Sequence, residues 1–204
     1  METGMLRWAA ATLTVRRLVA TSFVVGATLG LVAAGGYRIA APVEIFMSQF
    51  GLFVVVPTAV GYVASKASAA ASAATGLLVV MCLTYPLPYA DSVASWLLAA
   101  AVWTVFSLIA GPVFGLAGHA LRTDDRRGAL AAAGVLGMLG GEAIRMSQKG
   151  FAQGDLDLLS LSIGFDAAAV VVLGALIRPG RRGRVAVYAI PMAALGYAVT
   201  FVLR

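Results

Sequence analysis

Charged residues are scarce in this chain. Only 12% of its 204 residues are Asp, Glu, Lys or Arg, while 61% are hydrophobic. Soluble domains carry about twice that share of charge. Apolar runs of about 18 residues or more, which is enough to cross a bilayer, recur along the whole chain instead. We therefore predict a polytopic membrane protein.

Three reactive residue types are also nearly absent, because the chain has one cysteine, one histidine and two lysines. Cys82 has no partner for an internal disulfide and lies in an apolar segment, so we expect a core residue. His119 alone cannot form a histidine cluster, which argues against a metal site of that kind. Lys66 and Lys149 both fall in connections, which excludes a retinal Schiff base in the last span. We predict neither a metal nor a cofactor.

Several sequence motifs of known chemistry are missing as well. The chain has no Walker loop, no Gly-x-Ser-x-Gly and no His-Glu-x-x-His. The stretch TDDRR at 123–127 follows its acids with arginines, unlike the magnesium-binding pattern of prenyl transfer. The net charge of +6 does not indicate nucleic acid, because the arginines lie at the ends of apolar segments and contact lipid headgroups there. We expect membrane lipids as partners and no nucleic acid.

The apolar segments number seven and define an all-α, single transmembrane domain over residues 1–204. This arrangement places eleven Lys and Arg residues on one side and four on the other. Cytoplasmic loops are enriched in positive residues, so the first side, with the N-terminus, is predicted to be cytoplasmic. The Ala-, Gly-, Val- and Arg-rich composition is typical of actinobacteria, and we expect a bacterial cytoplasmic membrane. The predicted spans are 18–36, 43–64, 69–89, 93–119, 128–148, 157–177 and 185–203.

Acidic residues inside the spans are the first candidates for chemistry, because an ionisable side chain at membrane depth is costly unless it is paired, protonated or hydrated. Glu44, Glu142 and Asp166 all belong to the outer half of the predicted bundle. Asp166 lies about 13 Å deep at the helical rise per residue. Ser162 shares its helix face, no basic residue lies within helical reach, and burial therefore favours the protonated acid. The alternative role is a neutral Asp that hydrogen-bonds a neighbouring helix.

Arg145 follows Glu142 by three residues, which is close enough for an ion pair. One interpretation is a structural pair near the interface, and the other is that Arg145 fixes the acid or binds an anionic group beside it. Glu44 has a similar sequel, since MSQFG at 47–51 follows it as MSQKG at 146–150 follows Glu142. We interpret the two copies as similar polar helix ends around one cavity, or as a chance match. They add Ser48, Gln49 and Gln148 to the candidates.

Aromatic residues gather on two neighbouring spans. Trp96, Trp103 and Phe106 share one face of the fourth span, and Tyr85 and Tyr89 lie at the outer end of the third. Tyr and Trp near membrane interfaces commonly form a belt. Trp103 and Phe106 are too deep for that belt, so we predict that they line the interior.

The size of the chain, its seven spans and its intramembrane acids resemble those of the small membrane-integral terpene cyclases. These include bacterial enzymes that cyclise prenylated indoles or diketopiperazines, as in drimentine-type biosynthesis, and fungal meroterpenoid cyclases. The resemblance covers the whole chain and rests on architecture. It implies that a carboxylic acid protonates an alkene or epoxide without metal and without loss of diphosphate. The corresponding residues are Glu44, Glu142 and Asp166, whereas the acid of the fungal members' last helix has no counterpart in 185–203.

The resemblance also implies a lipophilic prenylated substrate as partner. The aromatic residues would stabilise the carbocation, and Arg145 and Gln148 would contact the polar head of the substrate. Two other classes of function fit the same acids: a small proton-coupled transporter and an accessory membrane protein. The oligomeric state stays open.

Overall fold

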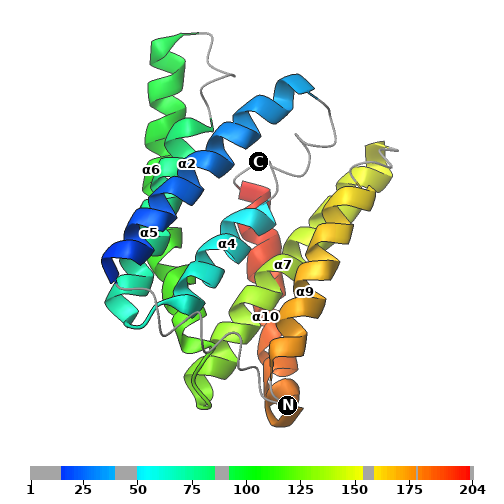
Figure 1. Cartoon of the computed structure of the whole chain (residues 1–204). Helices are drawn as coiled ribbons and strands as arrows, with labels where there is room; N and C mark the ends of the chain where they lie inside the picture. The colour runs from blue at the N-terminus through cyan, green and yellow to red at the C-terminus, as the bar shows by residue number, and fades with distance from the viewer. Residues whose placement is uncertain (1–14, 40–49, 86–91, 154–158, 178, 203–204) are drawn as a thin grey trace.

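The computed structural model describes residues 15–39, 50–85, 92–153, 159–177 and 179–202. These residues form seven α-helices and no strand, which confirms the predicted all-α class (Figure 1). A π-helical turn, η1 (Leu159–Ile163), leads into α9, and a 3-10 turn, η2 (Pro179–Arg181), leads into α10. The α-helices are α2 (Val15–Ile39), α4 (Phe50–Val63), α5 (Ala67–Thr84), α6 (Val93–Ala120), α7 (Arg126–Gln153), α9 (Gly164–Leu176) and α10 (Arg182–Val202).

Four of these helices are long and apolar enough to cross a membrane. They are α2, α5, α6 and α7, and the apolar helices at 51–63 and 160–175 are shorter. The predicted second span began at residue 43 and the predicted third ended at 89, but 43–49 and 86–89 lie outside the described residues. Among the described residues, the predicted helical pattern therefore matches the structure closely, and four segments have the dimensions of membrane spans.

The helices pack as two groups that meet where α4 and α6 contact α7. In the first group α4, α5 and α6 contact one another and α2 packs on α5, and in the second α7 packs along α10 and against α9. Helix α4 lies between the groups and contacts α7 and α9 as well as α5 and α6 (Figure 1). Any side chain on α4 that faces α7 and α9 therefore lies at the junction of the whole bundle.

Small residues allow several helix backbones to approach closely, as is common between membrane helices. A Cβ atom added to Gly26 of α2 would collide with the backbone of Leu77 on α5. A Cβ atom added to Gly141 of α7 would collide with backbone atoms of Ala193 and Tyr197 on α10. The abundant glycines of the chain thus serve helix packing at these two interfaces.

The core is centred on α5 and its neighbours. Leu77, Leu78 and Met81 of α5 are completely buried. Cys82 is buried beside them with a free thiol, and the hydroxyl of Ser107 on α6 donates a hydrogen bond to its Sγ at 3.2 Å. The prediction that Cys82 is a core residue is confirmed.

Candidate functional site

Two acidic side chains are buried inside the bundle, Glu142 on α7 and Asp166 on α9. Their exposed fractions are 0% and 1%. Burial extends to single atoms, because Oε2 of Glu142 and both carboxyl oxygens of Asp166 are shielded from solvent. Burying an ionised carboxylate in apolar surroundings is strongly unfavourable. Burial of these two acids is therefore costly, which makes them the first functional candidates among the residues that the structure describes.

The two carboxyl groups meet at Gly51 of α4. A Cβ atom on Gly51 would lie 2.7 Å from Oδ1 of Asp166 and 3.2 Å from Oε2 of Glu142. The two oxygens are therefore no further apart than these two distances together. The same Cβ atom would lie 2.8 Å from Cε1 of the Phe165 ring. Three helices thus converge on one pair of acids, and the absent side chain of Gly51 leaves the room for them.

Helix periodicity explains how Glu142 comes to be inside. Val135, Leu139 and Met146 lie seven residues before, three before and four after Glu142, and all three are completely buried. Residues at these spacings share one face of a helix. Glu142 therefore lies in the middle of the buried face of α7, while Lys149 is exposed near its end.

Asp166 is the third residue of α9, the helix that follows directly on the π-helical turn η1. Ser162 lies within that turn and is buried to 1%. Such turns are rare and frequently occur at functional sites, because they change which residues face a neighbouring helix. The local irregularity at Asp166 therefore agrees with a role for this carboxyl group beyond packing.

Arg145 lies three residues after Glu142 on α7, within one turn of the same helix. Its side chain is half-buried, and its Nη1 atom is shielded from solvent. A guanidinium group is permanently charged and donates hydrogen bonds in a fixed planar geometry. Arg145 thus places a permanent positive charge within one helical turn of Glu142.

An aromatic cluster lies between α4 and α6. Phe53 of α4 stacks on Trp103 of α6 with ring centroids 5.9 Å apart, and Trp103 meets Phe106 edge to face at 5.8 Å. Phe53 belongs to a core cluster that also contains Leu139, about one turn before Glu142 on α7. Val170, one turn after Asp166 on α9, packs against the same cluster. Trp103 and Phe106 are half-buried and pack against this core cluster, and Phe53 is an addition that the sequence did not single out.

Two further predicted residues lie near helix ends. Tyr85 packs against the cluster of Ala33 and Leu52, as does Phe165 beside the acid pair. The indole N–H of Trp96 donates to the carbonyl oxygen of Leu83 at 3.2 Å, which ties α6 to the end of α5.

Of the five remaining predicted residues, the structure describes only Gln148. Gln148 is exposed, and its Oε1 accepts a hydrogen bond from the hydroxyl of Tyr197 on α10 at 2.9 Å. The pair links α7 to the last helix, and Tyr197 is a residue that the sequence prediction missed. Glu44, Ser48, Gln49 and Tyr89 lie outside the described residues.

Gly51 is the central residue that sequence reasoning missed. Its one signal is its place at the end of MSQFG, the first copy of the repeat that follows Glu44. Nothing in that stretch says which other helices meet it, because that information lies in the tertiary packing. Over the part of the chain that the structure describes, His, Cys, Asp and Glu form no group of three or more that could hold a metal ion.

Fold and site together define a class of protein. It is a helical bundle with helices of membrane-spanning length and a buried pair of carboxyl groups where α4, α7 and α9 meet. The chain belongs to the Family of unknown function (DUF6518), which matches it over residues 9–204 and so includes all three site helices. No curated protein matches the chain, and no solved structure matches it.

Proposed function

We propose that this protein is an integral membrane enzyme that cyclises a lipophilic prenylated compound by protonating an alkene or epoxide. The acid is the Glu142–Asp166 pair, and seven helices cross the membrane with the N-terminus in the cytoplasm. The observation that carries the proposal is the convergence of two fully buried carboxyl groups on the bare backbone of Gly51.

The outer surface of α6 supports the membrane placement. Its large apolar side chains are widely exposed, and among them Leu98 is 70% and Ile109 is 66% exposed. A surface of this kind is unfavourable in water and suits contact with lipid tails. Lys66 and the arginines at the starts of α7 and α10 belong to connections predicted to share one side, which supports a cytoplasmic position for that side.

Close approach of two buried carboxyl groups favours a state in which they share a proton. Two like charges at short range repel each other, and burial penalises each charged form. A neutral carboxylic acid in such a site can act as a general acid toward a substrate that enters from the lipid. The second carboxyl group can then accept a proton at the end of the reaction.

The proposed reaction is an isomerisation that balances without a cofactor. The O–H bond of the acid breaks as the π electron pair of an alkene forms a new C–H bond, which leaves a carbocation on the other alkene carbon. The π pair of a second alkene attacks this carbon and closes the ring. Loss of a proton to the carboxylate forms the product alkene and restores the acid. With an epoxide, the proton goes to oxygen and a C–O bond breaks instead.

The reaction also requires that the carbocation be stabilised, and we propose this role for the aromatic rings of Phe53, Trp103 and Phe106. Aromatic faces attract a cation within about 6 Å of the ring centroid. Phe53 stacks on Trp103, and Trp103 meets Phe106 edge to face. Arg145 and Gln148 are proposed to contact the polar part of the substrate, with Trp96, Tyr85 and Ser162 shaping the site. Glu44, Ser48, Gln49 and Tyr89 keep their predicted roles, with Glu44 orienting the acid or taking the final proton.

A proton-coupled transporter is the second candidate, and the π-helical turn before Asp166 favours it. A turn of this kind can change register, which would move Asp166 relative to Glu142 on the other helix. Such a carrier would protonate and release the same carboxyl groups during transport. The two functions differ in whether the substrate is chemically changed.

The test uses purified full-length protein in detergent with prenylated indoles as probes and a chelator present. The proposal expects a product of unchanged mass but different chromatographic retention. Asp166→Asn and Glu142→Gln should each lower the rate by about 100-fold or more, the usual contribution of a general acid. Lys66→Gln is the control, because it neutralises an exposed side chain in the connection between α4 and α5.

Two outcomes would contradict the cyclase. One is cyclisation by both site variants at the rate of the parent protein. The other is proton-dependent uptake of the unchanged probe into proteoliposomes that is lost in the same variants, which would establish the transporter instead.

A further inference from the structure

Four exposed arginines mark the first turns of two neighbouring helices. Arg126 and Arg127 begin α7, and Arg182 and Arg184 lie at the start of α10. All four are exposed. Guanidinium groups bind phosphate in a planar, bidentate geometry. The question is whether the fold holds these two arginine pairs at one place.

Buried contacts directly below the arginines hold the two helix starts together. Val185, next to Arg184, is 4% exposed and belongs to one buried cluster with Ala129, Ala132 and Ala133 of α7. Ala129 follows Arg127 by two residues. The arginine pairs are therefore side by side at the same end of the α7–α10 pair.

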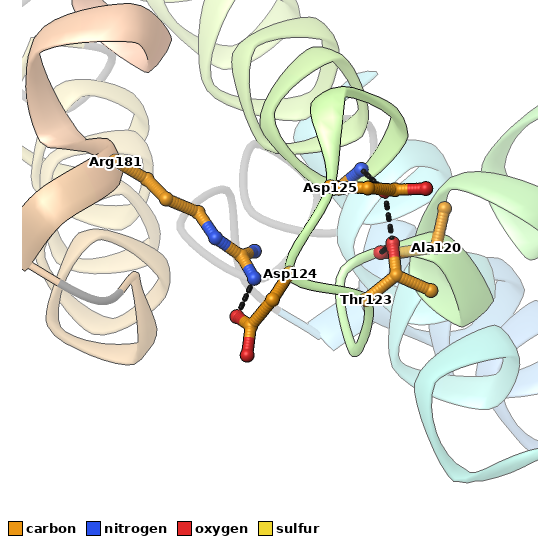
Figure 2. A network of polar contacts seen from close by, with 6 residues as sticks. Ala120, Thr123, Asp124, Asp125 and Arg181 are labelled. Atoms are coloured by element: carbon orange, nitrogen blue, oxygen red, sulfur yellow. Dashed lines mark hydrogen bonds and ion pairs between the residues drawn. The ribbon is translucent and has the colours of Figure 1, made fainter.

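The acidic residues of this region are engaged within the protein. Arg181 of η2 forms an ion pair with Asp124 in the connection between α6 and α7, as Figure 2 shows. Asp125 accepts a hydrogen bond from the hydroxyl of Thr123 at 2.7 Å (Figure 2) and another from the backbone N–H of Gly128 at 3.1 Å. Asp124 thus links the α6–α7 connection to η2, and Asp125 caps the start of α7. Two acids do not balance the four arginines and Arg181, so an excess of positive charge remains.

The ion pair also fixes the geometry of the surface. The guanidinium of Arg181 lies over the first turn of α7, because a Cβ atom on Gly128 would be 3.0 Å from its Nη1. Its side chain is only 11% exposed, whereas that of Asp124 is 52% exposed. The N-termini of α7 and α10 carry partial positive charge of their own, which adds to the attraction for anions.

We propose that the starts of α7 and α10 form one binding surface for the headgroups of anionic phospholipids. The headgroup phosphate contacts Arg126, Arg127, Arg182 and Arg184 together, while Asp124 and Arg181 hold the two helices in register. The proposal uses the membrane placement given above and is independent of cyclisation at the carboxyl pair.

Native mass spectrometry of the full-length protein in detergent tests this surface. The probes are phosphatidylglycerol and phosphatidylcholine in equal amounts, and the measurement is the number of each lipid retained. Wild type is expected to retain phosphatidylglycerol preferentially, and added salt should weaken that preference because it screens charge. Arg126→Gln/Arg127→Gln and Arg182→Gln/Arg184→Gln should each lose most of it.

The control variant is Arg16→Gln/Lys66→Gln, which removes two positive charges from exposed residues on other elements. It should keep the preference of the wild type. Equal loss in all three variants would overturn the proposal in favour of diffuse attraction, and retention by either arginine variant would overturn the shared surface. Circular dichroism shows whether each variant is folded, and no outcome depends on the enzymatic reaction.

Discussion

At the scale of single residues, the missing side chain of Gly51 determines how closely the two acids approach α4. Asp166 Oδ1, Glu142 Oε2 and the ring of Phe165 all lie within contact distance of the place where a Cβ atom would be. A methyl group at this position would have to displace a carboxyl group or an aromatic ring. Gly51 is therefore as much a part of the site as the acids themselves.

Gly51→Ala is expected to destabilise the protein by about 1–3 kcal/mol, the usual effect of overpacking a buried position. The measurement is thermal unfolding of the purified protein in detergent. Gly134→Ala is the control, because a Cβ atom there meets nothing within 4 Å. It should leave stability unchanged or raise it by up to about 1 kcal/mol, since alanine favours the helix. Equal behaviour of the two variants would contradict the geometry at Gly51.

Asp125 gives a prediction about pH outside the membrane-spanning segments. The Thr123 hydroxyl, followed by the backbone N–H of Gly128, lowers the pKa of the Asp125 carboxyl below its ordinary value of 3.8. The ionised form therefore stabilises the folded state at neutral pH, and this contribution is lost as the pH falls through the lowered pKa.

Asp125→Ala should accordingly lower the thermal midpoint at neutral pH, with a difference from wild type that shrinks as the pH falls below 3.8. Thr123→Val should show part of the same loss, because it removes the first of the two donors. A difference that grows toward acid would mean that the Asp125 carboxylate does not stabilise the start of α7.

At the scale of elements, α7 connects the two groups of helices. It packs along α10 and against α9, and it also contacts α4 and α6. The buried face of α7 carries Glu142. At Gly141 the backbone of α7 approaches the backbone of α10 closely. A change in the distance between α7 and α10 should therefore reach the acid site.

Gly141→Ala tests this role. The added methyl group meets backbone atoms of Ala193 and Tyr197, which cannot rotate away as a side chain can. We expect the α7–α10 distance to grow and the free energy of unfolding to fall by about 1–3 kcal/mol. Gly134→Ala on the same helix again serves as control, and a spin-label distance measurement between α7 and α10 would report the separation. An unchanged distance and stability would contradict the close packing.

The helical elements themselves were largely predictable from the sequence. The predicted span 93–119 corresponds to Val93–Ala120, and 128–148 lies within Arg126–Gln153. Glu142 and Asp166 were found because acids are conspicuous in apolar runs. The π-helical turn before Asp166 and the meeting with Gly51 were not predictable, since both depend on how separate helices pack. Phe53 and Tyr197 were not predicted for the same reason, because their partners, Trp103 and Gln148, are far away in the sequence.

At the scale of the whole molecule, the distribution of charge predicts an orientation in the membrane. Lys66 and the arginines at the helix starts lie on the predicted cytoplasmic side, and Lys149 lies near the end of α7 on the other side. The two lysines are exposed, so each offers a place for a label.

Cysteines introduced at the two lysines test this orientation in intact cells. With Cys82 replaced by alanine, Lys149→Cys should react with a membrane-impermeant maleimide, and Lys66→Cys should react only after the membrane is opened. The opposite pattern would reverse the orientation, and reaction at both positions would contradict a membrane crossing between them.

The central claim is that the Glu142–Asp166 pair holds a proton at neutral pH inside the bundle. Infrared spectroscopy of the purified protein tests it most directly, because a protonated carboxyl group absorbs apart from a carboxylate. The account predicts a protonated-carboxyl band in wild type and in Lys66→Gln that disappears or shifts in Asp166→Asn or Glu142→Gln. A wild-type spectrum without such a band at neutral pH, or a band that neither site variant alters, would contradict the account.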